Sequence, residues 1–318
     1  MIKYVKEIPA NIENLATLMV SHIDEDKIAL KKKIEESLKR LIRETLVQKN
    51  GDQYIFLTHE EQDINREIKN ISVDLGEVIQ KVSEIVFEEI YPDKKYKYSS
   101  RYNFSFNQIV DDRFFRGNQG NDIGLKIITP YYDTGVELTD NELKLMSARE
   151  NNLIVKLPND TAFLEEIEEI LRIESFLRKK GGVSLTQKIE EIKDGKRREA
   201  AERKNRVILL LTEAIKNADM YANSQKLEIK EKHPAERIND GFKILIEGIY
   251  KKLDYIKHFT TTKDLYDIFA DNEQFELNSG ETQNKLALDE VAGYIERNTA
   301  RNIPVTMKTI LGIYEKAP

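Results

Sequence analysis

The sequence predicts a mainly helical fold of the α+β class with small β elements. Three observations support this prediction. Apolar residues recur at helical spacing on both sides of a long polar stretch, KDGKRREAAERKNR, and predict one long helix over 184–221. The stretch just before it, DTAFLEEIEEILRIESFLRKK at 160–180, predicts a second amphipathic helix. Short runs such as NLIVKL at 152–157 predict strands.

These elements divide the chain into four expected regions. They are a partial winged-helix-like unit at 1–70, a small α+β domain with a mostly antiparallel sheet at 71–158, a long helical hairpin or coiled arm at 159–224, and a truncated region of C-terminal helices at 225–318. Two sites have the spacing of a helix-starting capping box, Thr58 with Glu61 and Thr139 with Glu142.

The winged-helix interpretation of residues 1–70 rests on the order of its elements. Two amphipathic helices, near 12–20 and 28–46, precede a hairpin signal at Asn50–Gly51. A wing follows a recognition helix in this way. The alternative is an ordinary helix followed by a β-hairpin.

The polar middle of the long helix raises a question of support. A helix over 184–221 would be roughly 55 Å long at ~1.5 Å per residue. Its middle has few apolar residues, so it must be solvated, clasped by a partner, or broken at Gly195, the one weak helix former. Ser184 and Gln187 have the spacing of a capping box at its start.

Composition narrows the class of protein. The 318-residue chain has no cysteine, which excludes disulfides, thiolate metal sites and cysteine nucleophiles and fits a cytoplasmic location. No run of about 18 apolar residues or signal peptide is present, so no membrane association is expected. The net charge of −6 means that nucleic-acid binding would need a local basic patch.

Catalytic and cofactor motifs are missing from the sequence. There is no GxxxxGK[ST] phosphate loop and no GxGxxG after a strand, and the four histidines are scattered. We therefore predict no catalytic, cofactor-binding or metal residue. Asp111 and Asp112 with Asp122 could ligate Mg²⁺ or Ca²⁺ across a loop, although a solvated loop explains them equally.

A basic cluster around 27–49 is the positive feature. The candidate nucleic-acid residues, for contact with duplex DNA, are Lys31, Lys32, Lys39, Arg43 and Lys49. The alternative is a solvated helix face, with Lys31–Glu35 and Lys32–Glu36 as i,i+4 pairs. Winged helices also serve as protein-binding modules.

Several long phrases carry a family resemblance. They are FLTHEEQDINREI, DIGLKIITPYYDTG, NELKLMSARENNLIVKLPNDTAFLEEIEEILRIESFLRK and AERINDGFKILIEGIYKKLDYI. With them the chain resembles, from about residue 10 to 318, the P-loop protein of BREX bacteriophage-exclusion systems, the BrxC/PglY family. The resemblance implies a phage-defence role beside other BREX components, in a parent ATPase that uses ATP and Mg²⁺. The Walker motifs are not in this sequence, so it implies a fragment downstream of the P-loop domain.

Three functional hypotheses follow. The leading one is a non-catalytic region of a BREX ATPase, serving protein assembly with other BREX components or itself, and DNA contact. The second is a stand-alone winged-helix DNA-binding regulator. The third is a hydrolase built on the Asp111, Asp112 and Asp122 loop.

Overall fold

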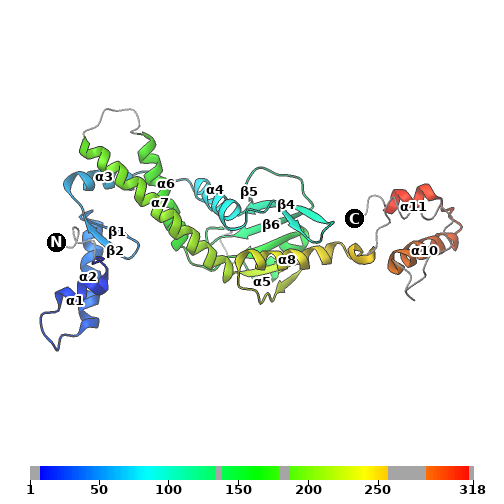
Figure 1. Ribbon diagram of the computed structural model, residues 1–318, viewed down its shortest axis with the longest axis horizontal. Helices are drawn as coiled ribbons and strands as arrows, with labels where there is room; N and C mark the ends of the chain where they lie inside the picture. Colours follow the sequence, from blue (N-terminus) through cyan, green and yellow to red (C-terminus); the bar gives the residue numbers. More distant parts are fainter. Residues whose placement is uncertain (1–7, 133–137, 180–186, 257–283, 315–318) are drawn as a thin grey trace, which may run out of the picture. The chain divides into compact units, whose positions relative to one another are not determined.

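The computed structural model describes residues 8–132, 138–179, 187–256 and 284–314 (Figure 1). It divides into two units, residues 1–239 and 240–318, and the limit falls within one helix, α8 (Pro234–Ile249). Ser184 of the expected capping box and the helix expected at 261–270 lie outside the described residues.

The first unit begins with two helices and a hairpin, in the order that the sequence predicts. These elements are α1 (Ile12–Met19), α2 (Lys27–Arg43), β1 (Val47–Asn50) and β2 (Gln53–Phe56). Asp26 caps α2 by accepting the backbone N–H groups of Ile28 and Ala29. Gly51, with φ of +62°, opens the two-residue loop between the strands. A small core of Ala16, Ile34, Leu38 and Val47 holds these elements together.

Two further helices lead from the hairpin to the sheet. They are α3 (His59–Lys69) and α4 (Leu75–Ile85), and α4 continues into a single π-helical turn, η2 (Val86–Ile90). The capping box predicted for Thr58 and Glu61 is confirmed at the start of α3. Ile64 and Ile68 of α3 pack into a second apolar core.

Seven strands of the described residues form one sheet, including both strands after the arm. The larger strands and their neighbours are β3 (Lys95–Lys97), β4 (Asn103–Val110), β6 (Ile123–Ile128), β7 (Asn152–Lys156), β8 (Asp219–Ala222) and β9 (Gln225–Leu227), paired in that order. The short strand β5 (Arg113–Phe114) pairs with β4 beside this path. The sheet therefore crosses the expected domain limits at 158 and 224.

The sheet is mixed rather than mostly antiparallel. Its outer pairings are antiparallel, whereas β4–β6 and β6–β7 are parallel. The loop after β5 and the helix α5 (Asp140–Arg149) each return the chain to the same end of the sheet, which makes these pairs parallel. Every residue of β6 is buried, as expected for a strand covered on both faces. Residues 96–106, where aromatic and polar side chains alternate, are divided between two strands, β3 and β4.

Helices cover both faces of the sheet. Helix α5 begins with the predicted capping box of Thr139 and Glu142, and it packs on β7, β8 and β9. Leu143 of α5 forms an apolar core with Tyr221 of β8 and Ile154 of β7. Helix α4 lies on the other face, against β4 and the arm (Figure 1).

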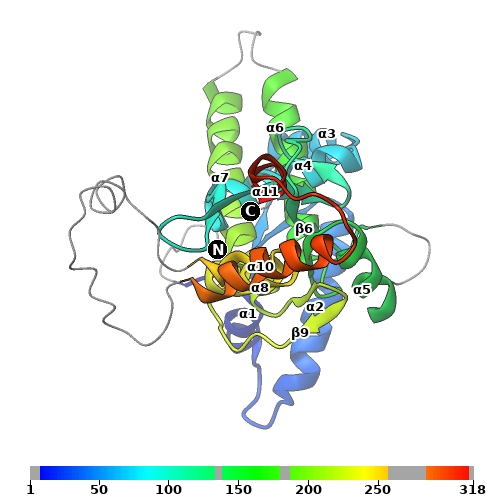
Figure 2. The ribbon, with the colours of Figure 1, turned by 90° about the vertical axis from the view of Figure 1, so that its right-hand side faces the viewer.

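The arm consists of two long helices that pack side by side (Figures 1 and 2). They are α6 (Ala162–Lys179) and α7 (Gln187–Lys216). Helix α7 is continuous through Gly195 and ends before Tyr221, which was expected within the helix. Pairing of Tyr221 with Ile154 buries its ring in the sheet, and this long-range contact outweighs the local helical spacing.

The second unit carries short helical elements after α8. These are η3 (Leu253–Tyr255), α10 (Lys285–Thr299) and α11 (Met307–Tyr314), within the region 225–318 where C-terminal helices were predicted. Lys252 pairs with Glu290, and the rings of Tyr294 and Tyr314 meet edge to face.

Candidate functional site

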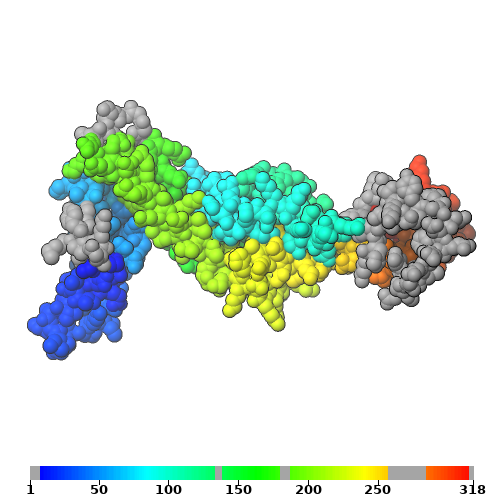
Figure 3. Space-filling model, viewed as in Figure 1, coloured from blue at the N-terminus to red at the C-terminus, as the bar shows by residue number. Residues whose placement is uncertain are grey.

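Helix α2 turns a basic face toward solvent. Ile34 and Leu38 are buried in the small core. Because an α-helix has ~3.6 residues per turn, a set of exposed cations falls on the opposite half of the helix. We call this set the basic face, and it comprises Lys32, Lys33, Lys39, Arg40 and Arg43. In the space-filling view, α1 and α2 stand out from the arm as the dark blue part of the first unit (Figure 3).

The charge of the basic face is not neutralised by neighbouring carboxylates. Within the described residues no ion pair joins any of its cations, and neither predicted pair, Lys31–Glu35 or Lys32–Glu36, is formed. Lys31 instead pairs with Glu13 of α1, and its hydrogen bond holds the pKa of that carboxyl below its ordinary value. Of the predicted set, Lys32 is therefore exposed without an ion pair among the described residues, whereas Lys31 is paired with Glu13. Glu36 remains as an exposed carboxylate among the cations.

Lys49 lies on the hairpin rather than on α2, and the hairpin is docked against α7. The Lys49 side chain is exposed, but its backbone carbonyl accepts a hydrogen bond from Arg203 at 3.4 Å. The Asn50 amide donates to Glu202 at 3.1 Å and accepts from Arg206 at 2.7 Å. The backbone of the tip and the Asn50 side chain therefore contact α7, while the Lys49 side chain is exposed.

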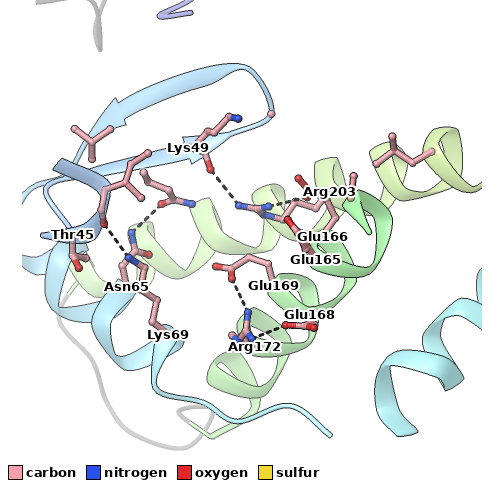
Figure 4. Close-up of a pocket in the computed structure, with 16 residues that line it drawn as sticks. Thr45, Lys49, Asn65, Lys69, Glu165, Glu166, Glu168, Glu169, Arg172 and Arg203 are labelled. Carbon is pink, nitrogen blue, oxygen red and sulfur yellow. Dashed lines mark hydrogen bonds and ion pairs between the residues drawn. The ribbon is translucent and has the colours of Figure 1, made fainter. Parts of the chain in front are cut away.

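A polar seam joins the hairpin to the arm. At its centre, the Gln48 side chain donates to Glu199 and accepts from Lys196 and Asn65, both at 3.0 Å. Arg203 donates to Glu166 of α6 at 2.8 Å (Figure 4). The seam comprises Gln48, Lys49 and Asn50 of the hairpin, Asn65 of α3, Glu166 of α6, and Lys196, Glu199, Glu202, Arg203 and Arg206 of α7.

The charged groups of the seam are buried as ion pairs. The side chains of Lys196 and Arg203 are each 8% exposed, and that of Glu199 is 11% exposed. Burial alone would raise the pKa of Glu199, but Lys196 and Arg203 outweigh it and the pKa is lowered. Burial likewise opposes the charge of Arg203, while Glu199 and Glu166 raise its pKa. Glu199 and Arg203 are therefore charged at neutral pH.

The seam answers the question of how the polar middle of α7 is supported. The helix is not broken at Gly195, and its inward cations are not solvated, because Lys193 and Lys196 are buried. The hairpin, α3 and α6 of the same chain pack around this part of α7 and bind its polar side chains.

Open grooves run along both sides of the seam. One, of about 640 Å³, lies between the hairpin and α6, with Lys69 on one wall and Glu165 and Glu169 on the other (Figure 4). The second, of about 580 Å³, lies between the hairpin face and α7, where Gln53 and Arg198 line opposite walls. The contact between hairpin and arm is therefore narrow.

The residues proposed for a metal site are not brought together. Asp111 and Asp112 follow the end of β4, and Asp122 precedes the start of β6. Since these strands are parallel, the residues lie at opposite ends of the sheet, roughly 20 Å apart at ~3.3 Å per residue. Asp112 instead pairs with the buried Lys126 at 2.5 Å. No group of three or more potential metal ligands occurs in the part of the chain that the structure describes.

Sequence reasoning missed the buried charges of α7, although a signal was present. The inward stripe begins with Ile189 and Ile192 and ends with Val207, Leu211 and Ile215. Between them, Lys196, Glu199 and Arg203 continue the same spacing of three or four residues. This continuity placed the charges on the inward face, but the buried partner was 151 residues away in Gln48.

The region that contains the sheet and the arm matches a known protein family. A family model described as the BREX ATP-binding protein BrxC 4th domain with six-stranded beta sheet matches residues 71–245, more than half of the chain. The chain belongs to the BrxC family. The matched residues contain the path of six paired strands from β3 to β9, with β5 at its side. This match joins the arm and the sheet in one domain. No solved structure matches the chain.

A second match concerns the winged helix of BrxC. The model described as the BREX ATP-binding protein BrxC winged helix-turn-helix domain matches residues 252–318, where only C-terminal helices were expected. The described helices within that range are the short η3 and the helices α10 and α11. The partial winged helix expected at 1–70 has the predicted helices and hairpin, but the family's winged helix lies at the other end of the chain. In the described residues, no helix has the length and apolar character needed to cross a membrane.

Proposed function

We propose that this chain is a non-catalytic region of a BREX ATPase that contacts duplex DNA through the basic face of α2. The observation that supports the proposal is the cluster of exposed, unpaired cations on one side of that helix. Between Lys32 and Arg43 the helix rises about 16 Å. Duplex DNA has one negative charge per ~1.7 Å of axis, so several phosphates lie within reach of such a helix.

Charge reversal tests this contact. We expect Lys32→Glu/Lys39→Glu/Arg43→Glu to weaken duplex binding by at least roughly tenfold. Each lost contact between a cation and a phosphate removes the favourable release of counterions from the DNA. Fluorescence anisotropy with a labelled duplex at low salt measures the affinity. The matched control, Lys94→Glu/Lys230→Glu/Lys232→Glu, changes the net charge equally at exposed positions away from α2. Equal losses in both variants, or no binding by the unmodified protein, would overturn the assignment.

Assembly with other BREX components, or self-association, is a second role that one observation favours. Large apolar side chains are exposed around the turn between α1 and α2, and they are Leu18, Met19, Val20, Ile23 and Ile28. Exposed apolar clusters are typical of protein contacts. Light scattering of the protein alone and with BREX proteins, repeated with Ile23→Asp, tests this role. Unchanged masses in every mixture would exclude it.

Family membership favours a region of an ATPase over a stand-alone regulator. The family's ATP and Mg²⁺ would be used by its P-loop domain, and the matched regions of this chain are the fourth domain and the winged helix. We expect the chain alone to hydrolyse no ATP and to act in the cytoplasm. Hydrolysis in a coupled assay that persists after repurification would contradict this expectation.

A further inference from the structure

We propose that the polar seam is a releasable contact that restrains DNA binding by the hairpin, an inference that rests on the proposed DNA contact of α2. In the docked state the hairpin tip is held on α7. In the released state the tip is free to reach a duplex that the basic face of α2 has already bound. The seam thus regulates how much of the first unit contacts DNA.

The first step is that the α1–α2–hairpin part has its own core. The residues of this core, and those packed against it, all lie between residues 12 and 54. The core that joins α3 to the arm is a separate cluster, built on Ile64, Ile68, Ile173 and Phe176. Release of the hairpin from α7 therefore leaves both apolar cores intact.

The second step is that the hairpin meets α7 through polar groups that water can replace. Gln48 and Asn50 make hydrogen bonds to charged side chains, and open grooves give water access from both sides. The buried Nε of Arg206 has no hydrogen-bond partner within the described residues, so the docked contact is not fully satisfied. Exchanging such bonds for bonds to water costs far less than exposing an apolar core.

The third step is electrostatic. On the arm side of the seam, the carboxylates of Glu166, Glu199 and Glu202 are balanced by three cations, Lys196, Arg203 and Arg206. The docked hairpin tip therefore faces a surface that offers a DNA phosphate no net attraction. The backbone carbonyl of Lys49 and both ends of the Asn50 amide are occupied by α7. Release separates the tip from this neutral surface and lets the exposed side chain of Lys49 approach the duplex without α7 in the way.

The hairpin-side variant Gln48→Ala/Asn50→Ala tests the restraint by removing seam bonds while leaving the arm unchanged. If about a tenth of the molecules are released in the unmodified protein, full release tightens duplex binding by about tenfold. The matched control is Gln53→Ala, on the same hairpin face and groove but outside the seam. We expect the control to bind DNA like the unmodified protein.

Release itself is measured without DNA. Because the chain has no cysteine, spin labels can be placed at Ser37→Cys on α2 and Ala201→Cys on α7, both exposed. We expect the distance distribution to broaden to longer values in Gln48→Ala/Asn50→Ala. The reverse experiment joins Gln53→Cys to Arg198→Cys across the groove with a bifunctional maleimide. This cross-link should remove the gain in affinity and keep binding by α2.

Two results would overturn the proposal. One is an unchanged label distance in Gln48→Ala/Asn50→Ala, which would show a rigid seam. The other is a longer distance with unchanged affinity, which would show that the seam does not restrain binding while DNA contact by α2 stands. Absence of duplex binding by both the unmodified and the released protein would instead refute the proposed function together with the restraint.

Discussion

Gly195 lies in the middle of helix α7, where neither the backbone conformation nor the packing requires glycine. Helix α7 continues through it, and a Cβ at this position would meet nothing within 4 Å among the described residues. Glycine costs roughly 0.5–1 kcal/mol relative to alanine in a helix interior.

We therefore expect Gly195→Ala to raise the free energy of unfolding by about 0.5–1 kcal/mol. Urea denaturation followed by circular dichroism measures this change. Ala201→Gly, at an exposed position of the same helix, should lower the stability by a similar amount. A less stable Gly195→Ala protein would contradict a continuous helix.

Titration of Asp111 makes the free energy of unfolding depend on pH. Its carboxylate accepts hydrogen bonds from the backbone N–H and the hydroxyl of Thr129, at 2.8 and 2.5 Å. Burial is the largest influence and raises the pKa of Asp111 from 3.8 to about 6. The folded protein then binds the proton more tightly than the unfolded chain, so this term is present below pH ~4 and is lost as the pH rises through ~6.

The comparison with Asp111→Asn isolates that term. Between pH 4 and 7 the unmodified protein should lose about 2–3 kcal/mol of stability relative to Asp111→Asn. Urea midpoints at several pH values in this range provide the measurement, since the other carboxylates are common to both proteins. Parallel pH profiles of the two proteins would show that the fold does not raise the pKa of Asp111.

Local residue roles were predictable where they depend on neighbours in sequence. The capping boxes at Thr58 and Thr139 follow from spacing alone and are confirmed. Lys126 could not be predicted as a buried cation. Its partners, Asp112 and Glu150, come from a turn and a helix end that only the folded sheet brings together.

At the scale of elements, Arg203 and Lys204 show that the position of a charged residue on α7 decides how much its ion pair contributes to stability. Arg203 is buried in the seam, with Glu166 at 2.8 Å. Its neighbour Lys204 also pairs at 2.8 Å, with Glu89, but both side chains of that pair are more than 40% exposed. Buried charges that lose a partner are costly, whereas exposed pairs contribute little.

We expect Arg203→Met to lower the free energy of unfolding by about 2 kcal/mol, because Glu166 and Glu199 each lose a buried, charged hydrogen-bond donor while Glu199 keeps Lys196 and Glu166 keeps Arg206. Lys204→Met is the matched control, and its cost should stay below about 1 kcal/mol. Chemical denaturation of both variants at one salt concentration gives the comparison. Equal costs would mean that the seam is as open to solvent as the outer face.

Element types were largely predictable and their pairings were not. Amphipathic spacing indicated the helices of the arm, and the short apolar run NLIVKL indicated the strand β7. The parallel pairing of β4, β6 and β7 depends on where loops return the chain, which periodicity does not encode. The clasp on α7 depends on a hairpin about 150 residues earlier in the chain.

At the scale of the whole molecule, the sequence phrases indicated the BrxC family, and the matches at 71–245 and 252–318 confirm it. The candidate site was only partly predictable. Lys32, Lys39 and Arg43 lie on the basic face, Lys31 is paired with Glu13, and Lys49 is on the docked hairpin. Helical spacing fixes the first group, but the other two residues depend on tertiary contacts.

The salt dependence of duplex binding tests the central claim most directly. The logarithm of the binding constant should fall linearly with the logarithm of salt concentration, with a slope near −0.9 per phosphate contact. Lys32→Glu/Lys39→Glu/Arg43→Glu should reduce the magnitude of that slope by about 2–3, since three contacts on α2 are lost. A slope that is the same in the variant and the unmodified protein would show that the basic face of α2 does not contact DNA.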